Sequence, residues 1–221
     1  PSVMGMGGAF RGVSQDMATL ELNPGAMGLS TTYGLDVSFG TQGDLGNGVG
    51  RLTVVDGKTR PGIVGGFSVE LGWSPAPVES YGWEVVGASA QEVELNTRAR
   101  AFTFGFGIPL SMDRRSSLGF TVKVDRLDLP DEDPNRTVNG DVGLYLRPIP
   151  QIAVGLVGNN IRPTGDANTP TTVGLGTALY VIPQVILAAD GVMDFTTQER
   201  ISGAFHIGIE GPTPGILPLR S

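Results

Sequence analysis

From residue 31 to the end of the chain, apolar residues alternate with small or polar ones, in runs bounded by Gly, Pro, Asp and Asn. A period of two is typical of a β-strand with one buried face. The runs predict ten strands, near residues 31–42, 48–56, 62–73, 97–110, 117–126, 137–148, 151–160, 170–181, 184–194 and 199–210, with the start of an eleventh at 217–220. No segment between them is long and periodic enough for a crossover helix, so neighbouring strands should pair antiparallel. The sequence predicts an all-β meander.

From the third connection between the predicted strands to the eighth, long and short connections alternate. The long ones are 74–96, 127–136 and 161–169, and the short ones between them are 111–116, 148–150 and 182–183. In an up-and-down sheet, alternate connections lie at the same end. One end should therefore carry the long loops and the other the tight turns, as in outer-membrane barrels.

Charge is confined to one face of the predicted strands. The other face is an apolar row in each strand, for example Phe102, Phe104 and Phe106. A soluble sandwich with its apolar face inside and a membrane barrel with its apolar face on lipid both fit this separation. The polar rows favour the barrel, because small residues such as Thr103 and Gly105 dilute their charges and suit a lumen better than a water-facing surface. The charges expected in the lumen are Glu70, Asp141, Arg147, Asp190 and His206.

Composition excludes several classes of protein. The chain has no Cys and one His, which removes disulfide scaffolds, thiolate chemistry and His-cluster metal sites. Its formal net charge is −7, with only two lysines, Lys58 and Lys123, so we expect no nucleic-acid partner. The chain begins Pro1-Ser2-Val3 without a signal peptide, and we expect that an export signal has already been removed.

The first thirty residues differ from the rest. Glycines precede a short helical stretch near residues 16–22, which must stop before Pro24 because the residue before a proline is pushed out of the helical region. The motif residues are Gly7, Gly8, Ala9, Phe10, Asp16, Asn23 and Pro24. This segment resembles the N-terminal signature of the FadL-like outer-membrane family, including its PorV-like branch. The later stretches LGFTVKV, GLVGNNI, TTVGLG and LAADGVMDF also look like strands of that branch.

The resemblance implies that residues 1–30 form a plug or hatch inside an antiparallel, up-and-down transmembrane β-barrel formed by residues 31–221. It also implies a porin-like protein in the outer membrane of a Gram-negative-type bacterium, without enzymatic activity or cofactor. Its function would be the passage of hydrophobic small molecules past the plug. The PorV-like branch implies a competing function, a barrel that transports nothing and anchors or shuttles partner proteins at the cell surface. The implied partners are membrane lipids, with either hydrophobic small molecules or other surface proteins.

The number of strands leaves two possibilities for the barrel. Members of the family have about fourteen strands, whereas ten are visible here. The chain is then either a fragment of a fourteen-stranded barrel or a smaller ten-stranded one, which an even strand count permits.

Aromatic residues gather around the connection 74–96. The candidate ligand-binding residues are Phe10, Trp73, Tyr81, Trp83 and Val85. The rings fit the aromatic belt that barrels place at the headgroup level. They also fit a lid over the barrel mouth that catches a hydrophobic ligand, and both interpretations stay open.

Two further groups of residues are weaker candidates for a metal site or a catalytic site. Asp131, Asp133 and Asn135 have a spacing of oxygen ligands that suits Ca²⁺, but Arg136 stands where a calcium loop needs Gly, and a solvated acidic loop is the better interpretation. His206 with Asp190 suggests a catalytic pair, but no serine nucleophile can be assigned to it. We therefore predict no metal site and no enzyme.

Overall fold

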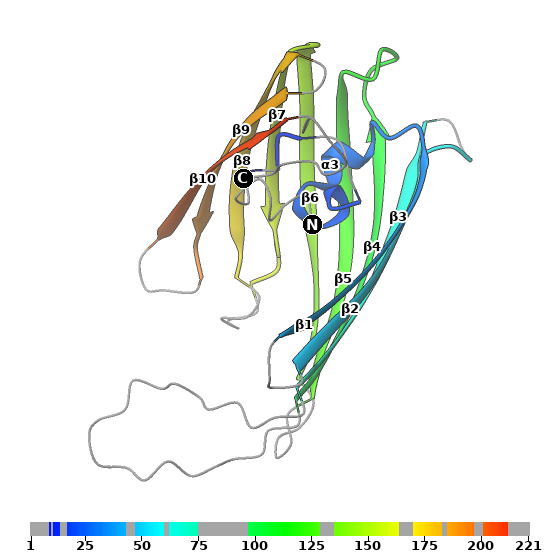
Figure 1. The fold of residues 1–221 in the computed structure, drawn as a ribbon, viewed down its shortest axis with the longest axis vertical. Helices are drawn as coiled ribbons and strands as arrows, with labels where there is room; N and C mark the ends of the chain where they lie inside the picture. The colour runs from blue at the N-terminus through cyan, green and yellow to red at the C-terminus, as the bar shows by residue number, and fades with distance from the viewer. Residues whose placement is uncertain are drawn as a thin grey trace.

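The structure is a computed structural model that describes residues 9, 11–13, 17–42, 47–59, 62–74, 97–128, 135–163, 170–182, 185–196 and 201–211. Its ten strands form one sheet in which each strand pairs antiparallel with the next (Figure 1). The strands are β1 (Tyr33–Gln42), β2 (Asn47–Asp56), β3 (Val64–Ser74), β4 (Thr97–Pro109), β5 (Ser116–Asp128), β6 (Asn135–Ile149), β7 (Ile152–Asn159), β8 (Thr172–Ile182), β9 (Val185–Asp194) and β10 (Ser202–Glu210). The predicted all-β meander is confirmed, and the predicted eleventh strand lies outside the described residues.

Two short helices precede the sheet, α2 (Thr19–Leu22) and α3 (Pro24–Met27). The first ends before Pro24, as predicted. The second was not predicted, and Asn23 starts it: its side chain accepts a hydrogen bond from the backbone N–H of Gly25 at 3.0 Å. Pro24 follows at a first-turn position, where the N–H that proline lacks has no partner within the helix.

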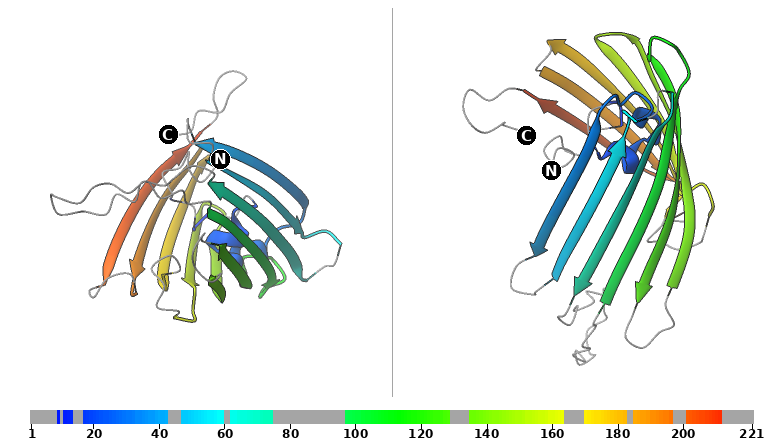
Figure 2. Two further views of the ribbon diagram at one scale, coloured as in Figure 1. Left: turned by 90° about the horizontal axis from the view of Figure 1, so that it is seen from below. Right: turned by 90° about the vertical axis from the view of Figure 1, so that its right-hand side faces the viewer.

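The sheet is strongly curved, and both helices lie in its hollow (Figure 2). We call the face that holds the helices the inner face and the opposite one the outer face. Helix α3 contacts β4, β5, β6 and β7, and α2 contacts β3 and β4. The helices therefore pack across the middle of the sheet.

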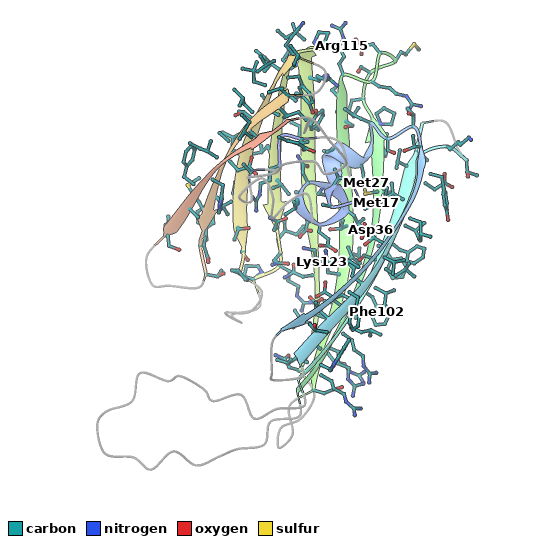
Figure 3. All side chains as sticks on the ribbon, viewed as in Figure 1. Met17, Met27, Asp36, Phe102, Arg115 and Lys123 are labelled. Atoms are coloured by element: carbon teal, nitrogen blue, oxygen red, sulfur yellow. The ribbon has the colours of Figure 1, made fainter. Side chains whose placement is uncertain are left out.

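The outer face is apolar and exposed. Phe104 is 58% exposed, Phe205 69% and Ile207 71%. Figure 3 shows Phe102 projecting from this face, whereas Met27 lies with the helices in the hollow. An apolar surface of this extent is typical of a face that meets lipid or another protein.

The strand order places β1 and β10 at the two edges of the sheet. Within the ranges that the structure describes, no pairing joins these two strands, so the closure of the barrel stays a prediction. The described helices include none that is long and apolar enough to cross a bilayer.

Candidate functional site

A row of glycines crosses the inner face beneath α3. Gly107 of β4 is directly opposite Gly119 of β5, which is directly opposite Gly143 of β6. A Cβ atom on Gly119 would lie 2.0 Å from the carbonyl oxygen of Pro24, and one on Gly107 would lie 2.4 Å from the backbone nitrogen of Gly28. The helix backbone thus rests directly on the sheet backbone, which side chains on this row would prevent.

The row has a counterpart under residues 11 and 12. Gly155 of β7 is directly opposite Gly176 of β8. A Cβ atom on Gly155 would lie 2.0 Å from the carbonyl oxygen of Arg11, and one on Gly176 would lie 2.6 Å from the backbone nitrogen of Gly12. We call Gly107, Gly119, Gly143, Gly155 and Gly176 the glycine seat. It holds the N-terminal segment in backbone contact with five consecutive strands.

Polar contacts fix the segment on this seat. The side-chain amide of Asn23 donates hydrogen bonds to the carbonyl oxygens of Arg11 at 3.0 Å and Leu144 at 3.4 Å. The hydroxyl of Ser117 donates to the carbonyl oxygen of Gly25. Asn23 is buried, at 1% exposure, so these bonds satisfy groups that have little access to water.

A buried carboxylate holds the start of the segment. Asp190 on β9 accepts a hydrogen bond from the backbone N–H of Arg11 at 2.8 Å and lies 3.3 Å from its guanidinium Nη1. The side chain of Asp190 is 0% exposed and that of Arg11 is 13% exposed. Since a buried charge is stable only with a partner, this ion pair ties the segment to β9.

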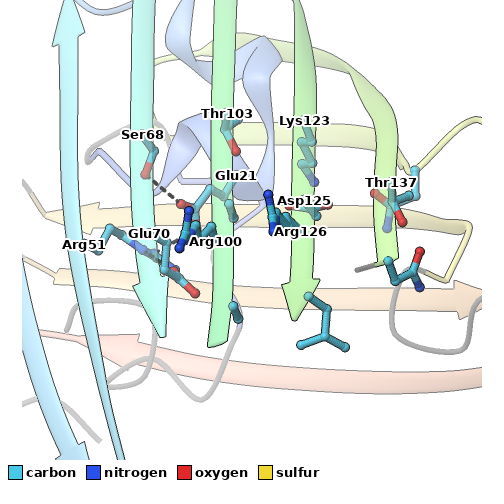
Figure 4. A pocket seen from close by; sticks show the side chains of 15 residues that line it. Glu21, Arg51, Ser68, Glu70, Arg100, Thr103, Lys123, Asp125, Arg126 and Thr137 are labelled. Carbon is cyan, nitrogen blue, oxygen red and sulfur yellow. Dashed lines mark hydrogen bonds and ion pairs between the residues drawn. The ribbon is translucent and has the colours of Figure 1, made fainter. Parts of the chain in front are cut away.

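A charged cavity of about 460 Å³ lies beside α2 (Figure 4). Arg51 of β2 forms ion pairs there with Glu21 at 2.8 Å and with Glu70. On β5, Lys123 lies 2.7 Å from a carboxylate oxygen of Asp141, whose side chain is fully buried. The cavity wall thus carries charges of both signs within a small space.

Burial raises the pKa of Glu21. The ion pair with Arg51 opposes this effect, as does the hydrogen bond that the Ser68 hydroxyl donates to Glu21 at 3.4 Å, but desolvation is the larger effect. The carboxyl of Glu21 therefore gains a proton at a higher pH than an exposed glutamate does.

The structure places many of the residues singled out from the sequence. The charges expected in the lumen are all on the inner face: Glu70, Asp141, Arg147, Asp190 and His206. His206 is directly opposite Asp190. Arg147 lies over the ring of Tyr180 on the same face, 4.5 Å from its centroid.

The candidate plug and ligand residues are placed less completely. Ala9, Asn23 and Pro24 are buried on the inner face, whereas Gly7, Gly8, Phe10 and Asp16 lie outside the described residues. Trp73 is on the outer face, its ring 5.6 Å from that of Phe39, and is not brought together with the charged cavity. Tyr81, Trp83 and Val85 also lie outside the described residues.

The weak calcium candidate is described only at Asn135, which begins β6 and is exposed. Asp131 and Asp133 lie outside the described residues. No group of His, Asp or Glu side chains in the described ranges could hold a metal ion.

Sequence reasoning missed the glycine seat and the pairing of Arg51 with Glu21 and Glu70. A signal for the seat was present, since Gly105, Gly107, Gly174 and Gly176 recur at every second position of their strands. Only the register shows that such glycines lie opposite one another.

No protein-family model and no curated protein matches this chain. Among solved structures it is similar to OmpTdeltaL8, a loop L8 deletion mutant of OmpT, which is an outer membrane protein of Vibrio cholerae. The TM-score is 0.57 and the sequences are 13% identical, with 81% of this chain and 59% of that chain covered. This chain thus spans about 59% of the length of that protein. The likeness shows a shared fold, an antiparallel sheet of the outer-membrane barrel kind.

Proposed function

We propose that this chain forms the wall of a β-barrel in the outer membrane of a Gram-negative-type bacterium, and that its N-terminal segment is a plug that limits passage through the interior. The proposal keeps the division into a plug at 1–30 and a barrel at 31–221. The observation that carries it is the glycine seat, on which the backbones of residues 11–12 and 24–28 lie against β4 to β8. A segment that did not pack on the sheet would not need a glycine at the facing position of each of five strands.

The charged cavity bears on the kind of solute. Passage of hydrophobic small molecules, which the family resemblance implies, needs an apolar path. The described inner wall instead presents Arg51, Glu70 and Lys123 next to the plug. We therefore favour small polar or charged solutes. The aromatic residues of the 74–96 connection keep the hydrophobic alternative open to test.

Solute passage can be measured on the full chain in lipid vesicles. We expect slow flux of small sugars and ions in the wild type, and faster flux when Arg11→Gln with Asp190→Asn removes the ion pair that holds the plug. Arg115→Gln is the matched control, because the side chain of Arg115 pairs with Asp113 in an exposed turn.

The other outcomes identify the competing functions. Uptake of a fatty acid without sugar flux, lost in Tyr81→Ala with Trp83→Ala, would replace our solute class by the hydrophobic one. If neither solute passes in any variant and other surface proteins co-purify with the wild type, the chain is an anchoring barrel and the plug proposal is wrong.

A further inference from the structure

Four arginines occupy outer-face positions of their strands, at the end of the sheet that carries the long connections. Two of them, Arg100 and Arg126, also line the charged cavity (Figure 4). Arg100 of β4 is directly opposite Arg126 of β5, which is directly opposite Arg136 of β6. Arg98 lies two residues before Arg100, on the same face of β4. Directly opposite residues of an antiparallel pair have Cβ atoms about 5 Å apart. Arg100, Arg126 and Arg136 therefore form one row across three strands, which we call the arginine row.

Among the described residues, little negative charge balances the row. Nε of Arg126 donates a hydrogen bond to Asp128 at 2.6 Å. Across the part of the chain that the structure describes, no carboxylate forms an ion pair with Arg98, Arg100 or Arg136. Like charges that face each other across strands destabilise a sheet. An anion from outside the sheet would remove this penalty.

The neighbours of the row place it at a membrane boundary. On one side, Trp73 is directly opposite Arg98 and lies on the outer face, and tryptophan prefers the headgroup level of a bilayer. On the other side, the same face continues with Phe102, Val124 and Val138, which are 39%, 39% and 49% exposed. The row thus lies between an apolar surface and a ring typical of the interface.

We propose that the arginine row binds the phosphate groups of a membrane lipid whose acyl chains lie along Phe102, Val124 and Val138. A guanidinium group binds phosphate oxygens through two parallel hydrogen bonds, and adjacent arginines can share one phosphate or hold two. A free anion would use the charges and leave the apolar surface uncovered. A phosphorylated lipid matches both parts of the surface. This inference rests on the proposed function, since it requires the outer face to meet lipid.

The connection between β5 and β6 offers a competing partner for the row. Its sequence contains Asp131, Glu132 and Asp133, next to the strands that carry Arg126 and Arg136. If these carboxylates balance the arginines, removing the arginines should destabilise the protein even where no phosphorylated lipid is present. Heat unfolding with and without added lipid separates this outcome from lipid binding.

The test titrates lipid into the full chain purified in a neutral detergent, with the heat-unfolding midpoint as readout. We expect cardiolipin, which carries phosphate groups on acyl chains, to raise the midpoint, and phosphatidylcholine or inorganic pyrophosphate to leave it unchanged. The variant Arg100→Gln with Arg136→Gln should need about tenfold more cardiolipin for the same rise. Arg100→Lys with Arg136→Lys should lie between the two, because lysine keeps the charge but loses the paired hydrogen bonds.

The control is Arg114→Gln with Arg115→Gln, which removes the same charge from the turn at the other end of β4 and should leave the titration unchanged. An equal response of wild type and row variant to cardiolipin would overturn the proposal. Stabilisation by pyrophosphate would identify a free-anion site instead. A row variant that is destabilised in detergent alone, with cardiolipin inert, would assign the row to the loop carboxylates.

The failure of this site and the failure of the proposed function give different results. A wild type that inserts into vesicles and passes solutes but ignores cardiolipin contradicts the lipid site alone. A wild type that stays soluble without detergent contradicts the membrane location on which both depend.

Discussion

The carboxylate of Asp190 lies at the contact point of two chain segments that are 179 residues apart, because it accepts a hydrogen bond from the backbone N–H of Arg11 at 2.8 Å. The guanidinium of Arg11 lies 3.3 Å from the same oxygen. One buried group thus satisfies both the backbone and the charge of the N-terminal segment. Any motion of this segment away from the inner face must expose or neutralise Asp190.

The ion pair gives the first prediction. Arg11→Gln leaves the Asp190 charge buried without its cation, so we expect the free energy of unfolding to fall by about 3–5 kcal/mol. Adding Asp190→Asn removes the unpaired buried charge and should restore much of the lost free energy of unfolding. Urea unfolding in lipid vesicles, read by tryptophan fluorescence, measures both effects. If the loss of stability in the double variant equals the sum of the losses in Arg11→Gln and Asp190→Asn alone, the interaction between the two side chains does not stabilise the fold.

The glycine seat gives the second prediction. In Gly119→Ala, the new Cβ would lie 2.0 Å from the carbonyl oxygen of Pro24, so α3 must move off the sheet. We expect a loss of about 1–3 kcal/mol in unfolding free energy, with faster protease cleavage in the N-terminal segment. Gly65→Ala in β3 is the matched control, since nothing lies within 4 Å of its new Cβ. Equal cleavage rates in the two variants would contradict direct seating of α3 on Gly119.

Local patterns in the sequence were sufficient to predict the sheet. The alternation of Phe102, Thr103 and Phe104 gives both the strand and the side to which each residue points, and the absence of crossover helices gives the antiparallel order. The four-residue helix α3 has no periodic pattern, because it is shorter than one heptad and depends on Asn23 and on contacts with the sheet.

The site depends on relationships that no local pattern contains. Gly119 and Gly143 become one surface only through the register of β5 and β6. Arg11 meets Asp190 only because the sheet curves around the N-terminal segment. Charge on the inner face could be predicted from strand alternation, whereas the pairing of those charges could not.

The outer face gives the third prediction. Phe104 is 58% exposed on this face, so Phe104→Arg should lower the free energy of unfolding in a bilayer by about 2–4 kcal/mol if that position lies near the bilayer midplane. Thr103→Ala on the neighbouring, inner position should change it much less. Folding into vesicles, followed by the shift of the heat-modifiable band on a gel, gives both values. Recovery of the wild type as a soluble monomer without detergent would contradict a lipid-facing outer surface.

The raised pKa of Glu21 gives the last prediction. Between the pKa of an unfolded glutamate, about 4.3, and the higher pKa in the fold, the folded protein holds a proton that the unfolded chain has lost. The contribution of Glu21 to stability is therefore greatest below this interval and falls as the pH rises through it. Glu21→Gln mimics the protonated form at every pH, so its unfolding midpoint should exceed that of the wild type more at neutral pH than at pH values below the interval.

Asp113 provides a control of opposite sign for this pH dependence. A hydrogen bond from the Ser111 hydroxyl lowers the pKa of Asp113 in the exposed β4–β5 turn. Its contribution to stability is present above the unfolded value, near about 3.9, and is lost as the pH falls through the lowered pKa. The difference in unfolding midpoint between Asp113→Asn and the wild type should therefore become smaller as the pH falls. The difference between Glu21→Gln and the wild type should become larger as the pH rises. If the difference in unfolding midpoint between Glu21→Gln and wild type does not vary with pH, the carboxyl of Glu21 in α2 is not desolvated in the fold.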